Sequence, residues 1–133
     1  MRIKLVLVAL VLLILASIFS YFFFFANSSS KTLVTVARVI DGDTFELANG
    51  KKVRLLGVDA PEKNKYFYSE AREKLKELIE NKNVFLETDV INSDSSGRLL
   101  RYVFVGDTFV NLEMIKLGLA NVYIVSQNEK YSS

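Results

Sequence analysis

An apolar run near the N-terminus limits most strongly what this chain can fold into. Residues 5–26 are interrupted only by two serines and one tyrosine. As a helix they would reach about 33 Å, which is enough to cross the hydrocarbon core of a bilayer. A helix in the core of a globular domain has a polar face, and this stretch has none. We therefore predict a transmembrane signal anchor or a signal peptide over residues 1–26.

The sequence leaves two interpretations of this segment open. Arg2 and Lys4 precede the apolar run, which favours an N-terminus in the cytoplasm and the rest of the chain outside. The apolar region of a cleaved signal peptide is usually about 7–15 residues long, so the greater length here favours an uncleaved anchor. The small residues Ala26 to Ser28 could still serve as a cleavage site. We expect a domain that is anchored to the membrane through residues 5–26 or secreted.

The rest of the chain has room for one domain. Residues 27–31 (Asn-Ser-Ser-Ser-Lys) are predicted to be a polar linker, and residues 32–133 to be the domain. Once Arg2 and Lys4 are set aside, the basic and acidic side chains of the whole sequence are equal in number. Net charge therefore gives no sign of nucleic-acid binding, and any basic surface must be local.

The sequence contains no cysteine and no histidine. The first absence excludes disulfides and thiol chemistry. The second excludes the commonest general base, histidine-ligated zinc, and serine–histidine nucleophile pairs. A hydrolase with this composition would have to work through carboxylates, arginines and a hard metal ion.

Hydrophobic patterning predicts a fold that is mainly β, with helices. The predicted strands are residues 33–40, 44–48, 51–58, 84–91 and 98–105. The predicted helices are residues 70–81 and 111–117, and an apolar extended run follows at residues 119–125. Asn49-Gly50 predicts a type I′ hairpin turn between the second and third strands. This order is typical of a five-stranded Greek-key barrel of the OB type with two to three helices.

Acidic residues follow the first and third predicted strands. Asp43 lies in an Asp-Gly-Asp-Thr segment, and Asp59 and Glu62 lie in Asp-Ala-Pro-Glu. Because these strands flank a hairpin, the two segments can meet at one end of the sheet. Two carboxylates, a backbone carbonyl and water form a suitable oxygen shell for Ca²⁺. Each segment alone is also ordinary turn sequence.

Two arginines are candidates for binding phosphate. Arg54 lies in the otherwise apolar residues 53–58, so it must reach a polar cleft or pair with a carboxylate. A structural ion pair with Asp43 or Asp59 is the alternative interpretation. Arg98 begins the last predicted strand, where an exposed edge charge is equally ordinary. A guanidinium offers a planar fork of donors that suits a phosphate better than an ammonium does.

These segments together resemble the staphylococcal nuclease (thermonuclease) family. Residues 39–44 (Val-Ile-Asp-Gly-Asp-Thr) and 53–62 (Val-Arg-Leu-Leu-Gly-Val-Asp-Ala-Pro-Glu) resemble its two signature segments. Gly97-Arg98 and the strand after it resemble a third, and the similarity runs in register over residues 36–123. The resemblance implies an OB-fold barrel and Ca²⁺-dependent hydrolysis of DNA and RNA, preferably single-stranded. Cleavage on the 5′-oxygen side would leave 3′-phosphates.

The resemblance also implies roles for individual residues. Asp43, Asp59 and the backbone carbonyl of Ala60 would bind Ca²⁺; the family commonly has threonine in place of this alanine. Glu62 would align or deprotonate the attacking water. The two guanidinium groups would hold the phosphate and stabilise its transition-state charge. The catalytic candidates are Arg54, Glu62 and Arg98.

Two tyrosines are candidates for contacts with bases. Tyr66 lies in a loop before the first predicted domain helix, and Tyr123 lies near the end of the similarity. Aromatic rings in such places stack on bases, although a ring in the loop could instead cover the core.

The C-terminus departs from the family pattern. Family members continue past the equivalent of Lys130-Tyr131 into a helix that packs on the barrel, and from the resemblance we expect this helix to be missing. We expect the chain to be marginally stable, or its barrel surface to be covered by the anchor, a dimer partner or lipid.

Three hypotheses follow for the function. The favoured one is an active nuclease, because all five acidic and basic site residues are present. The second is a catalytically inactive OB-fold module that binds oligonucleotides or a protein. The third is an incomplete product that neither folds nor acts.

Overall fold

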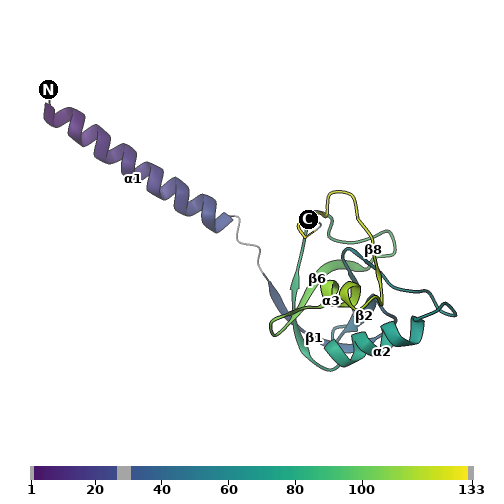
Figure 1. Ribbon diagram of the computed structural model, residues 1–133. Helices are drawn as coiled ribbons and strands as arrows, with labels where there is room; N and C mark the ends of the chain where they lie inside the picture. The colour runs from purple at the N-terminus through teal and green to yellow at the C-terminus, as the bar shows by residue number, and fades with distance from the viewer. Residues whose placement is uncertain (1, 27–30, 132–133) are drawn as a thin grey trace.

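Strands with one apolar face close into a barrel in this chain. The computed structural model describes residues 2–26 and 31–131. The five barrel strands are β1 (Thr32–Val39), β2 (Thr44–Leu47), β3 (Lys52–Leu55), β5 (Asn83–Glu87) and β6 (Leu99–Val105). Antiparallel pairs connect β3, β2, β1, β5 and β6 in that order, and a parallel pairing of β3 with β6 closes the barrel (Figure 1). This order confirms the predicted five-stranded OB-type barrel.

Two helices cover the barrel core. The first is α2 (Tyr68–Ile79), and the second is α3 (Val110–Lys116). Both bury an apolar stripe of the kind that helical periodicity requires. The buried residues of the stripes and of the strands that they cover form one cluster with Val36, Phe45, Val53, Leu55, Ala71, Leu75, Ile79, Val84, Val103, Val110 and Met114. Both predicted domain helices are therefore confirmed, with ends shifted by one or two residues.

The third predicted strand does not run unbroken to residue 58. Gly57 has φ +74°, a conformation in the left-handed region that interrupts an extended chain. The chain turns there, and β4 (Val58–Asp59) pairs with β8 (Asn121–Val122) instead of continuing β3. Residues 59–62, which follow this turn, line the candidate site described below. The predicted strand over residues 84–91 also ends early, at Glu87. Of the extended run at 119–125, only β8 is a strand.

The type I′ prediction for Asn49-Gly50 is wrong. Gly50 has φ +81°, but Asn49 is not among the residues with positive φ. The amide of Gly50 donates to the carbonyl of Leu47, and the amide of Leu47 donates to the carbonyl of Lys51. This is a three-residue hairpin loop with glycine in the left-handed position. The Asn49 side chain accepts a hydrogen bond from the Lys51 amide, which supports the wider loop.

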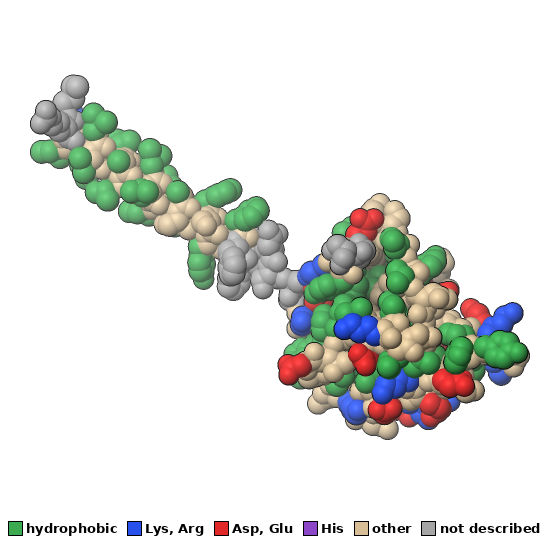
Figure 2. Space-filling model, in the orientation of Figure 1, with side chains coloured by type: hydrophobic (Ala, Val, Ile, Leu, Met, Phe, Trp, Pro, Cys, Tyr) green, Lys and Arg blue, Asp and Glu red, His purple; other side chains and the backbone are tan. Residues whose placement is uncertain are grey.

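The N-terminal helix α1 (Arg2–Ala26) is separate from the barrel in Figure 1. Its segment Ile3–Phe23 is long and apolar enough to cross a membrane, by length and composition alone, and none of it is buried. Figure 2 shows apolar side chains along the helix. Residues 27–30 of the predicted linker lie outside the described residues, so the linker and domain boundaries stay predictions.

The chain after α3 returns across the barrel. The Tyr123 amide donates to the Gly57 carbonyl, and the buried Asn128 side chain exchanges two hydrogen bonds with the backbone of Ile91. The Tyr131 ring packs edge-on against Tyr102, with centroids 4.7 Å apart. This segment covers the outer side of β6 and forms one wall of the candidate site.

Candidate active site

Residues from four parts of the sequence meet at the end of the barrel where β1 turns into β2. Two neighbouring cavities share Arg54, Glu62 and Arg98 as lining residues. One of the two cavities is also lined by Asp43, and the other is also lined by Asp59. The structure therefore brings together all five predicted acidic and basic residues. Further lining residues of these cavities are Asp41, Ala60, Pro61, Lys63, Tyr68, Ile91, Ser93, Asp94, Ser95, Ser96, Leu100, Tyr123 and Val125.

Asp43 is the buried carboxylate of the site. Its Oδ2 accepts a hydrogen bond from the Ala60 amide at 3.0 Å, and its Oδ1 accepts one from the Thr44 hydroxyl at 2.8 Å. Burial raises the pKa of Asp43 to about 6, although the Ala60 amide, Arg54 and Thr44 all act in the opposite direction. Hydrogen bonds thus hold the ionised Asp43 carboxylate in place, but they and the charge of Arg54 do not offset the effect of burial on its pKa.

Arg54 bridges the two acidic segments. Its Nη2 lies 3.4 Å from Oδ2 of Asp43 and 3.1 Å from Oδ1 of Asp59. The same nitrogen donates to the Val58 carbonyl at 3.4 Å. The ion pair that the sequence left as an alternative is therefore present. Arg54 nevertheless lines both cavities.

Arg98 is held by a residue of the loop before it. Its Nε donates to Oδ2 of Asp94 at 2.7 Å, while Oδ1 of Asp94 accepts from the Arg98 amide at 3.0 Å. Burial acts to raise the pKa of Asp94, but the hydrogen bonds and charge of Arg98 outweigh it and hold that pKa below its usual value. Nη1 of Arg98 lies 3.5 Å from the Thr44 hydroxyl. The guanidinium therefore reaches from Asp94 towards the start of β2.

Glu62 differs from the other acids of the site. It is exposed and lines both cavities. Within residues 2–26 and 31–131, no hydrogen bond or ion pair engages its carboxylate. An exposed carboxylate beside two guanidinium groups can accept a proton from a water molecule in the same space.

Comparison with known proteins agrees with this arrangement. The family described as "Staphylococcal nuclease homologue" matches residues 52–133. A thermonuclease of Staphylococcus intermedius is 39% identical over 105 residues, which cover 72% of this chain and 62% of that protein. Endonuclease YncB of Bacillus subtilis is 40% identical over 116 residues, covering 79% of this chain and 55% of that protein.

The chain belongs to the staphylococcal nuclease family. The match to a thermonuclease of Staphylococcus hyicus is 36% identical over 115 residues. It covers 80% of this chain and 68% of that protein. The chain spans 62% and 55% of the lengths of the first two relatives. Membership of the family explains the closed barrel, but it leaves the activity of the whole protein to be tested.

The acidic pair of this family member fits an open oxygen site for a hard cation. Asp43 and Asp59 both lie within 3.4 Å of the same nitrogen of Arg54, so their carboxylates face one small space that already holds a positive group. Ala60, the predicted carbonyl ligand, lines the cavity that Asp43 also lines. Among the described residues, no group of three or more His, Cys, Asp or Glu side chains forms a ready-made metal cage. A cation held here would keep positions open for water and phosphate.

The two tyrosines differ in their positions. Tyr123 lines the cavity that contains Asp59, and it is half exposed. Tyr66 is 94% exposed and is not part of either site cavity, so the structure does not bring it to the acidic and basic cluster.

The sequence reasoning missed Asp94 and the hydroxyl of Thr44 as site residues. Thr44 lies between Asp43 and Arg98 and contacts both. An aspartate three residues before a turn glycine, as Asp94 is before Gly97, is a recognisable turn signal. That signal predicts the loop, but it does not predict the contact with Arg98.

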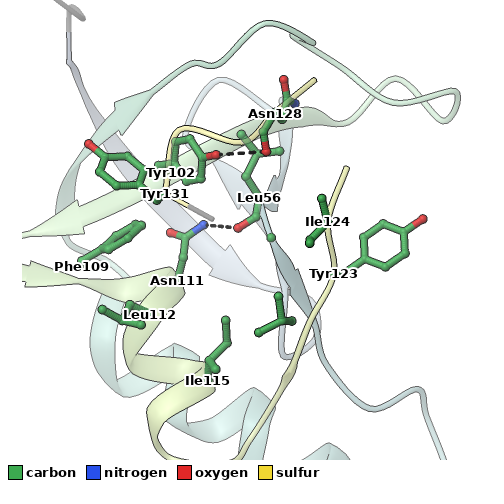
Figure 3. Close-up of a pocket in the computed structure, with 12 residues that line it drawn as sticks. Leu56, Tyr102, Phe109, Asn111, Leu112, Ile115, Tyr123, Ile124, Asn128 and Tyr131 are labelled. Atoms are coloured by element: carbon green, nitrogen blue, oxygen red, sulfur yellow. Dashed lines mark hydrogen bonds between the residues drawn. The ribbon is translucent and has the colours of Figure 1, made fainter. Parts of the chain in front are cut away.

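A separate apolar cavity lies beside the site. It is lined by Leu56, Phe109, Leu112, Ile115 and other residues around the Asn111 side chain, which donates to the Leu56 carbonyl at 2.8 Å (Figure 3). It contains no charged side chain. Hydrolysis of a phosphodiester needs charge stabilisation, so this cavity is not a candidate for the reaction.

Proposed function

We propose that this chain is a nuclease that hydrolyses DNA and RNA, preferably single-stranded, outside the cytoplasm. The observation that carries the proposal is the convergence of two guanidinium groups, two ion-paired carboxylates and one free carboxylate on a shared polar space. The names of its relatives, thermonuclease and endonuclease, support the same reaction class. Residues 1–26 would act as a signal anchor or signal peptide, residues 27–31 as a linker and residues 32–133 as the nuclease domain.

Asp43, Asp59 and the carbonyl of Ala60 would hold Ca²⁺. When bound, the ion supplies positive charge to a phosphate oxygen and helps stabilise the transition state. Arg54 is the cation that now holds both carboxylates. With another cation on those acids, Arg54 would be free to turn its donors to the phosphate.

The free carboxylate and the arginines would carry the reaction itself. Glu62 accepts a proton from water as the water oxygen forms a bond to phosphorus, and the bond from phosphorus to the 5′-oxygen breaks. The 5′-oxygen leaves as a hydroxyl after taking a proton from solvent water, and the other fragment keeps a 3′-phosphate. Arg54 and Arg98 donate to the phosphate oxygens, whose negative charge grows in the transition state. The protein thus acts chiefly by positioning and by fixed charge.

Aromatic side chains near the site would bind bases. Tyr123 lies in the wall of the cavity, where a base next to the scissile phosphate could stack on its ring. Tyr66 is exposed in a loop that also carries Lys63 and Lys65, a composition that suits an extended nucleic acid strand. Loss of either ring should raise KM more than it lowers kcat.

The test is release of acid-soluble nucleotides from denatured DNA and from RNA by the full chain, with Ca²⁺, Mg²⁺ or EDTA. Glu62→Gln and Arg98→Ala should each lower kcat by a factor of about 100 or more. Lys74→Ala, on α2 and outside both site cavities, is the matched control and should retain full activity. End-group analysis should find 3′-phosphates. A folded chain that binds oligonucleotides without cutting them under any metal would instead establish the binding module.

A further inference from the structure

A row of apolar side chains crosses the outer face of the barrel. Leu33 on β1 pairs with Phe85 on β5, Phe85 pairs with Phe104 on β6, and Phe104 pairs with Phe109 on β7 (Thr108–Phe109). Directly paired residues of antiparallel strands share a face of the sheet. We call these four residues the apolar row. Leu33 is 57% exposed and Phe85 is 42% exposed, so two large apolar side chains lie open side by side on neighbouring strands. Phe104 and Phe109 are half buried and pack against Tyr131.

The apolar row lies where the chain enters the domain. Lys31, the last residue of the predicted linker and the first described residue after Ala26, places its Nζ 3.6 Å from the centre of the Phe104 ring. The Nζ of the same lysine lies 3.9 Å from Oε2 of Glu87, a buried residue two positions after Phe85 on β5. A shallow groove is lined by Lys31, Phe85, Phe104 and the turn residues Gly106 and Asp107. Figure 1 shows the chain joining the barrel at the start of β1.

The connection between this face and α1 is short. Four residues, 27–30, separate Ala26 from Lys31. Even fully extended, this connection spans at most about 18 Å. The outer end of α1 is rich in aromatic residues, with Phe19, Tyr21, Phe22 and Phe23. Aromatic residues of membrane helices gather at the level of the lipid headgroups.

We propose that Leu33 and Phe85, the exposed end of the apolar row, form a lipid-docking face that rests on the bilayer in which α1 is inserted. This proposal rests on the proposed role of α1 as a membrane anchor. The short connection holds Lys31 near the headgroups, and the exposed Leu33 and Phe85 enter the interface. Lys31 can extend its ammonium to lipid phosphates while its carbon chain stays against Phe104. Docking fixes the orientation of the domain, and the residues of the candidate site are not part of this face.

The position of the site agrees with this orientation. β1 carries the chain from the apolar row towards Asp41 and Asp43. Its eight residues span about 26 Å. A nucleic acid can therefore reach Arg54 and Arg98 without displacing the docked face.

The absence of cysteine allows a direct test. Single cysteines replace Leu33, Phe85 or Glu77 in the full chain, and each is labelled with a fluorophore. Glu77 is an exposed residue of α2 and serves as the control. Each chain is placed singly in phosphatidylethanolamine–phosphatidylglycerol nanodiscs that contain headgroup spin-labelled lipid. The fluorophores at 33 and 85 should be quenched several-fold more strongly than the one at 77.

Equal quenching at the three positions would overturn the proposal. A second set of discs holds two chains each. Quenching at 33 and 85 that arises only in these discs would also overturn the proposal, because it would show contact between two copies of the chain. A fluorophore on Asp107→Cys provides a second measurement that leaves Leu33 and Phe85 in place. Adding Leu33→Ser and Phe85→Ser to that variant should lower the quenching at 107 to the level of the control at 77. Flotation with vesicles tests the anchor separately, and nuclease activity of the same samples tests the proposed function. Neither result depends on the quenching.

Discussion

At the scale of single residues, the site depends on contacts that aim charged groups. Arg98 can donate to a phosphate only if its guanidinium faces the cavity, and Asp94 holds it through Nε. Asp94 also accepts hydrogen bonds from the amides of Ser96 and Arg98, so one carboxylate both shapes the loop and orients the arginine. The two contributions can be separated by substitution.

Asp94→Asn should lower activity without unfolding the loop. The amide oxygen of asparagine can still accept from the two backbone amides, but the negative charge at Nε of Arg98 is lost. We expect kcat to fall between about 10- and 100-fold, because the phosphate-binding group is less well positioned. The melting temperature should stay close to that of the parent, as it should for the control Asp107→Asn. Full activity in Asp94→Asn would contradict a positioning role.

Asp43 should make the metal-free domain less stable as pH rises from about 4 to about 6. Its pKa is raised from 3.8 to about 6 in the folded state, so the folded chain binds this proton more tightly than the unfolded chain. Stability from this group is therefore present at low pH and is lost as the pH passes through the folded pKa, by up to about 3 kcal/mol. Urea unfolding in EDTA across this range measures it, and Asp43→Asn is the control that should lack this contribution. A stability difference between the two proteins that does not change with pH would refute it.

The sequence could predict the chemistry of the site better than its contacts. Residue types at strand ends made Asp43, Arg54 and Asp59 candidates, because a buried arginine needs acids and acids at neighbouring strand ends can meet. Their expected roles came from the resemblance to the nuclease family. The contacts of Thr44 with Asp43 and Arg98, and the bridge from Arg54 to both acids, join residues from separate strands and loops. Such distances arise from tertiary packing, which residue spacing does not encode.

At the scale of elements, glycines decide where strands stop. The strand patterns predicted the barrel and both domain helices, because alternating and helical periodicities were clear. They could not predict the break after β3, since Gly57 lies in an apolar run that reads as one strand. The hairpin loop was also mispredicted, because Asn49-Gly50 is compatible with a two-residue and a three-residue loop.

Gly42 permits close packing between the end of β1 and α2. A Cβ atom at this position would lie 2.7 Å from the Cβ of Ala60 and 2.7 Å from the Cβ of Ala71. Gly42→Ala should therefore lower the free energy of unfolding by about 1–3 kcal/mol, because two elements must move apart. It should also weaken activity, since Ala60 donates to Asp43.

The matched variant for Gly42→Ala is Gly50→Ala. Gly50 has open space around a Cβ but a φ of +81°. Gly50→Ala should lower the free energy of unfolding by about 1 kcal/mol through backbone strain alone, and activity should not change. Chemical denaturation and the nuclease assay measure both variants. Equal effects of the two on activity would show that packing at Gly42 does not support the site.

At the scale of the whole molecule, the start and the end of the domain meet at one buried carboxylate. Glu87 is 1% exposed, and it accepts a hydrogen bond from Nζ of Lys130 near the C-terminus. Lys31 approaches it from the N-terminal side, and the Tyr131 hydroxyl donates to it at 3.2 Å. The sequence predicted that the barrel surface near the C-terminus would need covering. It gave no sign of how residues 123–131 pack, because irregular chain has no periodicity to interpret.

This ion pair should couple the ends of the domain measurably. The Glu87 carboxylate raises the pKa of Lys130, chiefly through the hydrogen bond between them. Lys130→Met removes a partner from a buried charge and should lower the free energy of unfolding by about 2 kcal/mol. Adding Glu87→Gln should recover most of that loss, because the neutral amide no longer needs a cation and can still accept from Tyr131. Urea unfolding of the parent, the two single variants and the double variant gives the coupling energy. Strictly additive effects would mean that the two ends are held by ring packing alone, and Tyr131→Ala would then be the more damaging change.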